Sequence, residues 1–300
     1  MIHFPQAKIN LGLNVVAKRA DGYHDLETVF FPVPLFDTLE VLPMDVRFPS
    51  ATDCDLKVSH GLTRFDTEDG IGNGLARLDT EKNRFDTGDE QKNLVVKAYN
   101  MLKEEHPDIP RVHIHLHKAI PTQSGMGGGS SDCASMLLIM NELAKLGLTQ
   151  EQLIERAARL GADCPIFILN RPAYAEGIGE RLQPVDLDLS GWLLAVVRPD
   201  IAVSTKEAFS LITPKRPEQN CRDIVMGCPV EDWRDALKND FEQSVFTIHP
   251  EIGEIKERLY ELGAAYSAMT GSGSAVFGLF RQPIDVAAHF PTMFARLLTL

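Results

Sequence analysis

The stretch from Lys118 to Asp132, KAIPTQSGMGGGSSD, combines the residue types that a phosphate-binding loop needs. Its glycines are Gly125, Gly127, Gly128 and Gly129. Glycine lets a backbone turn through positive φ and bring its amides close to a ligand. Ser130 or Ser131 can then cap the helix that MLLIMNELAKLG predicts. A glycine loop that ends at a helix N-terminus leaves N–H groups unpaired, so this stretch predicts a phosphate site.

A glycine-rich turn before a capped helix is the plainer interpretation of the same stretch. Three consecutive glycines before two serines exceed what capping requires, so phosphate binding is favoured. Two common phosphate motifs do not fit. No GK[ST] follows the loop, as it would in a Walker A motif, and the GxGxxG fingerprint with its downstream acidic residue is not matched.

Two further polar groups stand out from their surroundings. In AKINLGLNVV, residues 7–16, apolar and polar residues alternate, which predicts a strand with Lys8 and Asn10 on the face away from the core. No acidic partner flanks them in sequence, so a solvated face and a functional face are about equally favoured. In GADCPIFI, Asp163 precedes Pro165, and this spacing alone favours an N-cap over a catalytic role.

Tyr23 and His24 follow a DG turn signal near the N-terminus. Such a pair is usually ordinary packing, but it can also stack on a flat ring and hydrogen-bond to its edge. A second glycine cluster, GSG at 271–273, lies between two strand-like runs, where a tight hairpin turn is the simplest interpretation. Two glycine-rich loops in one chain favour convergence on one ligand only modestly.

Patterned segments must position these residues. Residues 26–43 predict two strands broken by Pro32 and Pro34. RVHIHLHKAIP predicts a strand that delivers Lys118 to the glycine loop, with three histidines on one face, where solvent is favoured over zinc. Residues 63–91 are polar and predict a long surface loop.

The remaining patterns predict a mixed chain. Helices are expected at 93–105, 149–160, 233–245 and 250–262. Thr149 and Gln152 form a capping box at the start of the second of these helices. A hairpin is expected at 173–185, a buried strand at 192–197 and a loop at 214–229.

Composition narrows the class of protein. The chain has 300 residues, is 44% hydrophobic and 24% charged, which is typical of a soluble globular protein with a full core. A net charge of -12 argues against a nucleic-acid surface. The five scattered cysteines predict neither a disulfide framework nor a zinc ribbon and favour a reducing cytoplasm. Neither a signal peptide nor a membrane span is predicted.

The motifs resemble those of the GHMP small-molecule kinases. PTQSGMGGGSSD is similar to their phosphate loop, and MTGSGSAVFGLF is similar to their third motif. AKINLGLNV with ADGYH, KNLVVKAY, LGADCPIF and AYAEGIGERL resemble one branch of that superfamily, whose members phosphorylate a cytidine-diphosphate-linked methylerythritol. These motifs cover most of the chain and occur in the expected order.

The resemblance implies a fold and an activity. The implied fold is α+β, with an N-terminal ATP-binding domain at 1–171 that resembles domain 2 of ribosomal protein S5. A C-terminal α/β-sandwich domain follows at 172–300, and the active site lies between the two. The implied reaction is transfer of phosphate from ATP, with Mg²⁺, to the 2-hydroxyl of this small-molecule substrate, in non-mevalonate isoprenoid precursor synthesis. No nucleic acid or membrane takes part, and the protein is expected to be a monomer or a homodimer.

The motif match also implies roles for particular residues. Asp163 would be the catalytic base, with Lys8 as its partner. A positive charge a few Å from an aspartate favours its ionised, carboxylate form. The residues implied at the nucleotide are Asn93, Lys118, Pro121, Gly125, Met126, Gly127, Gly128, Gly129, Ser130 and Ser131. The residues implied at the acceptor are Asn10, Tyr23, His24, Thr205, Phe209, Gly271, Ser272 and Gly273. No protein ligand for a metal is implied.

The sequence departs from the family pattern at three positions of the glycine loop. Gln123 stands where glycine is usual, Asp132 where asparagine is commoner, and Met126 replaces leucine conservatively. Residues 63–91 are also longer than the family usually carries. Two alternatives stay open: another GHMP kinase, acting on homoserine or mevalonate, and a catalytically inactive nucleotide-binding regulator. ADGYH argues against the first, and the presence of both Lys8 and Asp163 argues against the second.

Overall fold

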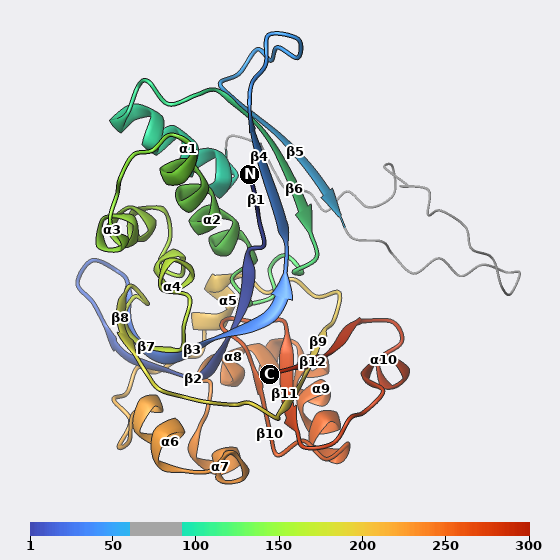
Figure 1. The fold of residues 1–300 in the computed structure, drawn as a ribbon. Coiled ribbons are helices and arrows are strands. Elements are labelled where there is room, and N and C mark those ends of the chain that lie inside the picture. The colour runs from blue at the N-terminus through green and yellow to red at the C-terminus, as the bar shows by residue number, and fades with distance from the viewer. Residues whose placement is uncertain (61–91) are drawn as a thin grey trace, which may run out of the picture.

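The computed structural model describes residues 1–60 and 92–300, so the surface loop predicted at 63–91 lies outside the described residues. Three four-stranded sheets organise the described part of the chain. The first sheet comprises, in spatial order, β1 (Ile2–His3), β4 (Thr38–Pro43), β6 (Val112–Lys118) and β5 (Cys54–His60). Its helices are α1 (Leu94–Glu105), α2 (Gly128–Leu143), α3 (Gln150–Leu160) and α4 (Cys164–Leu169). Figure 1 shows them gathered on one side of this sheet.

The second sheet is antiparallel and crosses the middle of the molecule. It comprises β2 (Gln6–Lys18), β3 (His24–Phe36), β7 (Ala173–Gly177) and β8 (Arg181–Pro184). The predicted break at the prolines was wrong, because β3 runs through Pro32 and Pro34 and ends before Asp37. Since β7 pairs only with residues 26–30 of β3, the prolines lie where β3 has a neighbour on one side only, and a missing N–H is tolerated there.

A bulge in β2 decides which core each of its residues enters. The pairing with β3 shifts register between Leu11 and Leu13, where Gly12 has a φ of 69°. Ile9, before the bulge, packs in a core shared with the third sheet, and Leu13, after it, packs in the C-terminal core. The opposite face of β2 is not solvated, since Lys8 is only 1% exposed.

The third sheet has helices on one face and the second sheet on the other. It comprises β10 (Tyr266–Met269), β11 (Val276–Phe280), β9 (Leu193–Arg198) and β12 (Phe294–Thr299). Leu194 of β9 packs toward β2 and β3, whereas Ala195 packs toward the C-terminal helices. This alternation produces the expected α/β sandwich.

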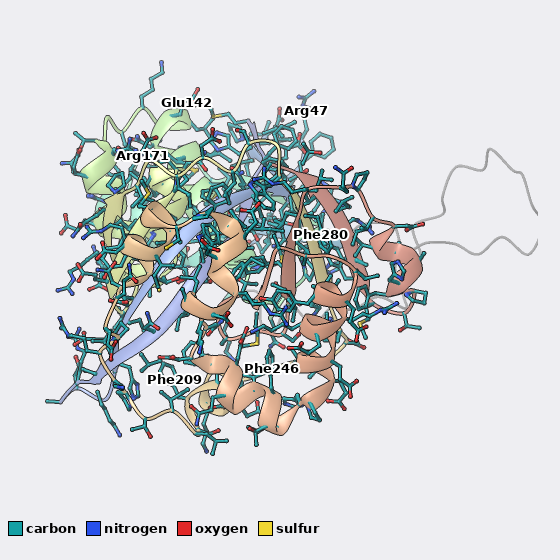
Figure 2. All side chains as sticks on the ribbon, turned by 90° about the horizontal axis from the view of Figure 1, so that it is seen from below. Arg47, Glu142, Arg171, Phe209, Phe246 and Phe280 are labelled. Atoms are coloured by element: carbon teal, nitrogen blue, oxygen red, sulfur yellow. The ribbon has the colours of Figure 1, made fainter. Side chains whose placement is uncertain are left out.

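The C-terminal helices are short. They are α5 (Thr205–Phe209), α6 (Cys221–Gly227), α7 (Trp233–Ala236), α8 (Phe241–Ile248), α9 (Pro250–Glu261) and α10 (Val286–His289), with a 3₁₀ turn at Val230–Asp232. Phe209 of α5 and Phe246 of α8 come from two helices that pack together (Figure 2). The helix predicted at 233–245 is therefore two helices, and the loop predicted at 214–229 contains α6. Among the described helices, none is long and apolar enough to cross a membrane.

Local signals at helix ends were partly correct. The capping box at Thr149 and Gln152 is confirmed at the start of α3. The prediction that Ser130 or Ser131 caps α2 was wrong, because the helix begins one turn earlier and Gly127 occupies the N-cap position. Glycine can take the φ of 74° that this position requires, whereas a serine there would be strained.

The sheet topology bears on the division of the chain. β7 and β8 lie after residue 171 but belong to the sheet of the N-terminal half, because β7 pairs with β3 and β8 pairs with β7. We therefore propose that the boundary between the two domains lies after Pro184 rather than between residues 171 and 172. The core shared by Ile9 and Leu194 joins the two halves across this boundary.

Candidate active site

The glycine loop is held by close packing against the rest of the site. A Cβ on Gly127 would lie 2.7 Å from Phe167 and 3.2 Å from the Lys8 side chain. A Cβ on Gly125 would lie 1.9 Å from the carbonyl oxygen of Thr270. Side chains at these two positions would clash, so glycine is required there for space as well as for positive φ.

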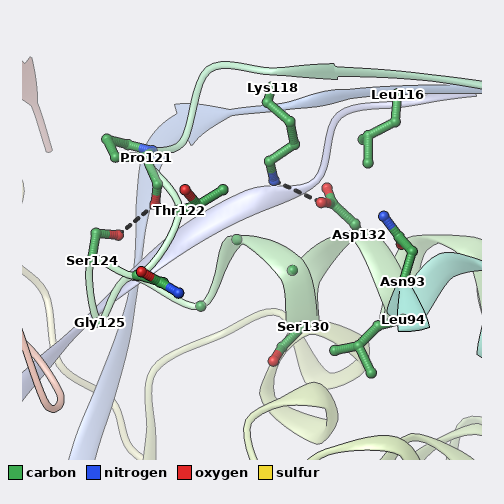
Figure 3. A pocket seen from close by; sticks show the side chains of 14 residues that line it. Asn93, Leu94, Leu116, Lys118, Pro121, Thr122, Ser124, Gly125, Ser130 and Asp132 are labelled. Carbon is green, nitrogen blue, oxygen red and sulfur yellow. Dashed lines mark hydrogen bonds and ion pairs between the residues drawn. The ribbon is translucent and has the colours of Figure 1, made fainter. Parts of the chain in front are cut away.

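A pocket of about 370 Å³, here called the nucleotide pocket, opens between the glycine loop, β6 and the start of α1 (Figure 3). Its lining includes most of the residues predicted for the nucleotide: Asn93, Lys118, Pro121, Gly125, Gly127, Gly128, Gly129 and Ser130. Asn93 also caps α1, since its Oδ1 accepts from the Val95 amide at 2.9 Å. Segments far apart in the sequence thus form one concave surface beside the N-terminus of α2.

Two residues predicted for the nucleotide do not line this pocket. Met126 is fully buried in the core, and its carbonyl oxygen accepts from the Lys8 amide at 3.0 Å. Ser131 is 1% exposed and lies within the first turn of α2. Both positions therefore hold the loop on β2 and α2, and their predicted contact with the nucleotide has no support in this geometry.

Lys118 is buried between two carboxylates rather than free to approach a ligand. Its Nζ contacts Asp37, and it donates to Asp132 Oδ2 at 2.7 Å (Figure 3). Asp37 Oδ1 also accepts from the amides of Ala119 and Ile120. Burial raises the pKa of Asp132 to about 7, because Lys118 offsets only part of the cost and Asp37 adds to it. One ammonium on the pocket lining therefore pairs with two carboxylates, of which Asp132 also lines the pocket.

Lys8 and Asp163 come together from distant parts of the sequence. Lys8 Nζ lies 3.3 Å from Asp163 Oδ2, and it donates to Asn10 Oδ1 at 2.6 Å and to the Gly125 carbonyl at 2.8 Å. The ammonium also sits 5.1 Å from the centre of the Phe30 ring. Asp163 occupies the N-cap position of α4 without using its side chain as a cap, and this side chain is 36% exposed. The carboxylate is thus open to solvent on one side and paired on the other.

A second pocket of about 380 Å³, here called the acceptor pocket, lies between the glycine loop and residues 202–207 and 272–273 of the C-terminal half. Of the residues predicted for the acceptor, Thr205, Ser272 and Gly273 line it. Gly271 instead supports the loop, because its carbonyl accepts from Asn239 Nδ2 at 2.8 Å. Gly125 lines both pockets, so the two pockets meet at the glycine loop.

The two glycine clusters touch each other through Thr270. Its hydroxyl donates to the Gly125 carbonyl at 3.2 Å and accepts from the Asn10 amide at 3.1 Å. Asn10 is 2% exposed, and its side chain bonds Lys8 and Thr28 rather than facing a pocket. The two glycine clusters are therefore in direct contact, with Asn10 as a support beneath them, while their convergence on one ligand stays a prediction.

Of the aromatic residues predicted for the acceptor, Tyr23 and His24 lie at the end of the β2–β3 hairpin and Phe209 lies in α5. The rings of His24 and Phe209 stack, with centroids 4.4 Å apart and planes 20° from parallel. Phe209 also meets Phe241 edge-on at 4.7 Å. Tyr23 is 61% exposed. His24 and Phe209, which sequence reasoning named as two separate contacts, thus stack on each other, and neither they nor Tyr23 line the nucleotide pocket or the acceptor pocket.

Several residues of the two pockets were not among those predicted for the nucleotide or the acceptor. Gln123 lines both pockets, Asp132 lines the nucleotide pocket, and Ser204 and Glu207 line the acceptor pocket. Ser204 and Glu207 form a capping box, and the S-T-K-E pattern could have revealed it. Thr270 carried no local signal, because its role depends on a neighbour 145 positions away.

Comparison with known proteins agrees with this geometry. The model of the GHMP kinases N terminal domain matches residues 93–171, and the GHMP kinases C terminal model matches residues 230–294. A 4-diphosphocytidyl-2-C-methyl-D-erythritol kinase from Parabacteroides distasonis is 47% identical over 283 residues, which cover 94% of this chain and 93% of that protein.

Solved structures show the same relationship. A crystal structure of 4-(cytidine 5'-diphospho)-2C-methyl-D-erythritol kinase superposes with a TM-score of 0.75 at 30% identity, covering 100% of this chain and 99% of that one. A homoserine kinase from Cytophaga hutchinsonii shares the fold, with a TM-score of 0.60 at 14% identity, over 98% of this chain and 93% of that one. The chain belongs to the 4-diphosphocytidyl-2-C-methyl-D-erythritol kinase family of the GHMP kinases.

Proposed function

We propose that this chain transfers the γ-phosphate of ATP to the 2-hydroxyl of 4-diphosphocytidyl-2-C-methyl-D-erythritol, in non-mevalonate isoprenoid precursor synthesis. The observation that carries the proposal is the position of the Lys8–Asp163 pair. Lys8 bonds the carbonyl of Gly125, which borders both pockets, so the pair lies beside the place where donor and acceptor would meet. Identity of 47% over almost the whole length of a named relative supports the choice of acceptor.

In the proposed reaction the acceptor oxygen attacks the γ-phosphorus while the bond to the β-phosphate oxygen breaks. The hydroxyl proton passes to Asp163, and ADP leaves. Lys8 pairs with the carboxylate, and its bonds to Asn10 and Gly125 fix the position of the ammonium beside it. Gly128, Gly129 and Ser130 at the start of α2 line the nucleotide pocket, where their amides would stabilise phosphate oxygens.

Magnesium fits this site only as an ion carried by the nucleotide. The described residues hold no group of three or more His, Cys, Asp or Glu side chains that could cage a metal. Mg²⁺ commonly takes its ligands from substrate phosphates, water and one or two protein oxygens. Ser130 and Asp132, which both line the nucleotide pocket, carry the protein oxygens that would complete such a set. When bound, the ion supplies charge neutralisation between the β- and γ-phosphates.

The acceptor would enter with its cytosine at the β2–β3 hairpin. The His24–Phe209 pair offers a flat ring surface, and Tyr23 is exposed next to His24 in the chain. From there the acceptor would extend along Thr205 and Ser272 toward Gly125. We further propose a cytoplasmic location, from the cysteine usage of the sequence, and a monomer or homodimer as the working unit.

Steady-state kinetics on the purified protein tests the proposal. ATP, Mg²⁺ and 4-diphosphocytidyl-2-C-methyl-D-erythritol should yield ADP and a product heavier by one phosphoryl group, and homoserine and mevalonate should be turned over at least a hundredfold more slowly. Faster turnover of either competitor would reassign the chain to another kinase activity. ATP binding without transfer to any acceptor would indicate an inactive regulator instead.

A further inference from the structure

Gln123 adopts a backbone conformation that side chains rarely take. Its φ is 51°, in the left-handed region, where the Cβ of most residues crowds the next carbonyl. Among the described non-glycine residues, only Lys145 and Asn170 share this conformation. Those two follow the ends of α2 and α4, where a left-handed residue closes a helix. Gln123 ends no helix, so capping does not account for its conformation.

The position of Gln123 suggests what the conformation serves. Gln123 and Gly125 are the two residues that line both the nucleotide pocket and the acceptor pocket. Since Gly125 has no side chain, Gln123 is the one residue with a side chain that the two linings share. It is exposed, and its amide makes no hydrogen bond to another described residue. The side-chain amide of Gln123 is therefore a hydrogen-bond donor without a partner among the described residues, and it belongs to a residue at the junction of the two pockets.

Phosphoryl transfer places its charge at this junction. The transferring phosphoryl group passes from the nucleotide pocket to the acceptor pocket, and its equatorial oxygens carry the negative charge throughout. A neutral amide presents two N–H donors and can bond such an oxygen without gaining or losing a proton. Backbone strain retained at a functional position is commonly linked to such a role.

We infer that Gln123 is a further catalytic residue, whose side-chain amide donates a hydrogen bond to the phosphoryl group in transit between the two pockets. This inference rests on the proposed kinase function. The acceptor oxygen still forms the new bond to phosphorus, the bond to ADP still breaks, and Asp163 still takes the proton. Gln123 stabilises the negative charge of the phosphoryl group, and it neither forms a covalent bond nor gains or loses a proton.

Three variants test the inference. Gln123→Gly removes the amide and suits the backbone, so it should lower kcat roughly 10- to 100-fold while the KM for ATP changes less than about threefold. Gln123→Glu keeps the size but replaces the donor by a carboxylate, so kcat should fall at least as far. Lys145→Gly is the matched control, because it changes a residue with φ of 53° that lies outside both linings, and kcat should stay unchanged.

Thermal melting separates a catalytic effect from a folding effect. Gln123→Gly and Lys145→Gly should shift Tm in the same direction and to within about 4 °C of each other. Wild-type kcat in either Gln123 variant would overturn the inference, and so would a loss confined to the KM for ATP. If the wild type prefers another acceptor, or only hydrolyses ATP, the same comparison of kcat is made with that acceptor or with water. A failure of the proposed function is thereby distinguished from a failure of the Gln123 inference.

Discussion

Lys8 Nζ lies 3.3 Å from Asp163 Oδ2, although the two residues are 155 positions apart in the sequence. Lys8 is almost fully buried and is held from the other side by Asn10 and by the Gly125 carbonyl. The pair therefore belongs to a rigid support, since β2 presents the ammonium while the N-terminus of α4 presents the carboxylate. An enzyme gains most from such fixed charges where charge or a proton moves during the reaction.

Replacing the proposed base should stop transfer without preventing nucleotide binding. Asp163→Asn keeps the size of the side chain but cannot accept the hydroxyl proton, so kcat should fall roughly 10²- to 10⁴-fold. The Kd for ATP should change little. Asp186→Asn, at an exposed position outside both linings, is the control and should behave as wild type. Near-normal kcat in Asp163→Asn would remove this residue from the mechanism.

Two glycines of the loop should respond in opposite ways to an added methyl group. The Cβ of Gly125→Ala would meet the Thr270 carbonyl at 1.9 Å, and φ is 75°, so Tm should fall clearly. The Cβ of Gly129→Ala meets nothing within 4 Å and lies in α2, so Tm should hold or rise. Because Gly129 lines the nucleotide pocket, its variant should nevertheless weaken ATP binding, by about tenfold or about 1.4 kcal/mol.

Thermal melts and calorimetric titration with ATP would measure both effects. Gly129→Ala is informative because stability and binding are expected to separate. Unchanged ATP affinity in that variant would place the triphosphate away from the start of α2. A lower Tm in Gly129→Ala than in Gly125→Ala would contradict the packing described for the loop.

The exposed Tyr23 ring at the β2–β3 hairpin should affect the KM for the acceptor and leave the KM for ATP unchanged. Tyr23→Ala should raise the KM for the cytidine acceptor by about tenfold or more, because stacking on a base is worth about 1–3 kcal/mol. The KM for ATP should stay constant, since Tyr23 is not part of the nucleotide pocket lining. Tyr23→Phe keeps the ring and is the matched control. Equal KM values for Tyr23→Ala and wild type would mean that Tyr23 is a solvated turn residue.

The buried Asp132 predicts an unusual dependence of stability on pH. Its pKa is about 7 in the folded protein, chiefly because of burial, against 3.8 for an ordinary aspartate. Between about pH 4 and pH 7 the folded state therefore holds a proton that the unfolded chain has released. Stability contributed at this site is thus present at low pH and is lost as pH rises through that window.

Asp132→Asn removes this titration while keeping an acceptor for Lys118. The difference in Tm, variant minus wild type, should therefore increase from pH 5 to pH 8. Thermal melts at unit steps of pH measure it, with Asp186→Asn as a control for loss of a surface carboxylate. A difference that stays constant with pH, or decreases, would show that Asp132 is ionised throughout and that Lys118 satisfies both carboxylates.

Local patterns in the sequence determined the parts of this protein that depend on near neighbours. The glycine loop, the capping box at Thr149 and the β10–β11 hairpin follow from φ preferences and from hydrogen bonds between residues a few positions apart. The same local logic failed at Pro32, because a strand tolerates proline wherever no neighbouring strand needs its N–H.

Only the tertiary structure decided which distant groups meet. Three contacts join segments whose sequences do not indicate that they are neighbours. They are the pairing of β7 with β3, the burial of Lys118 between Asp37 and Asp132, and the hydrogen bond of Thr270 to Gly125. Such contacts form because sheet pairing and core packing act between whole elements, and a side chain then meets whatever the neighbouring element presents. For that reason the residue types predicted a phosphate loop, whereas the pairing of Asp163 with Lys8 was implied only by the family resemblance and its geometry comes from the fold.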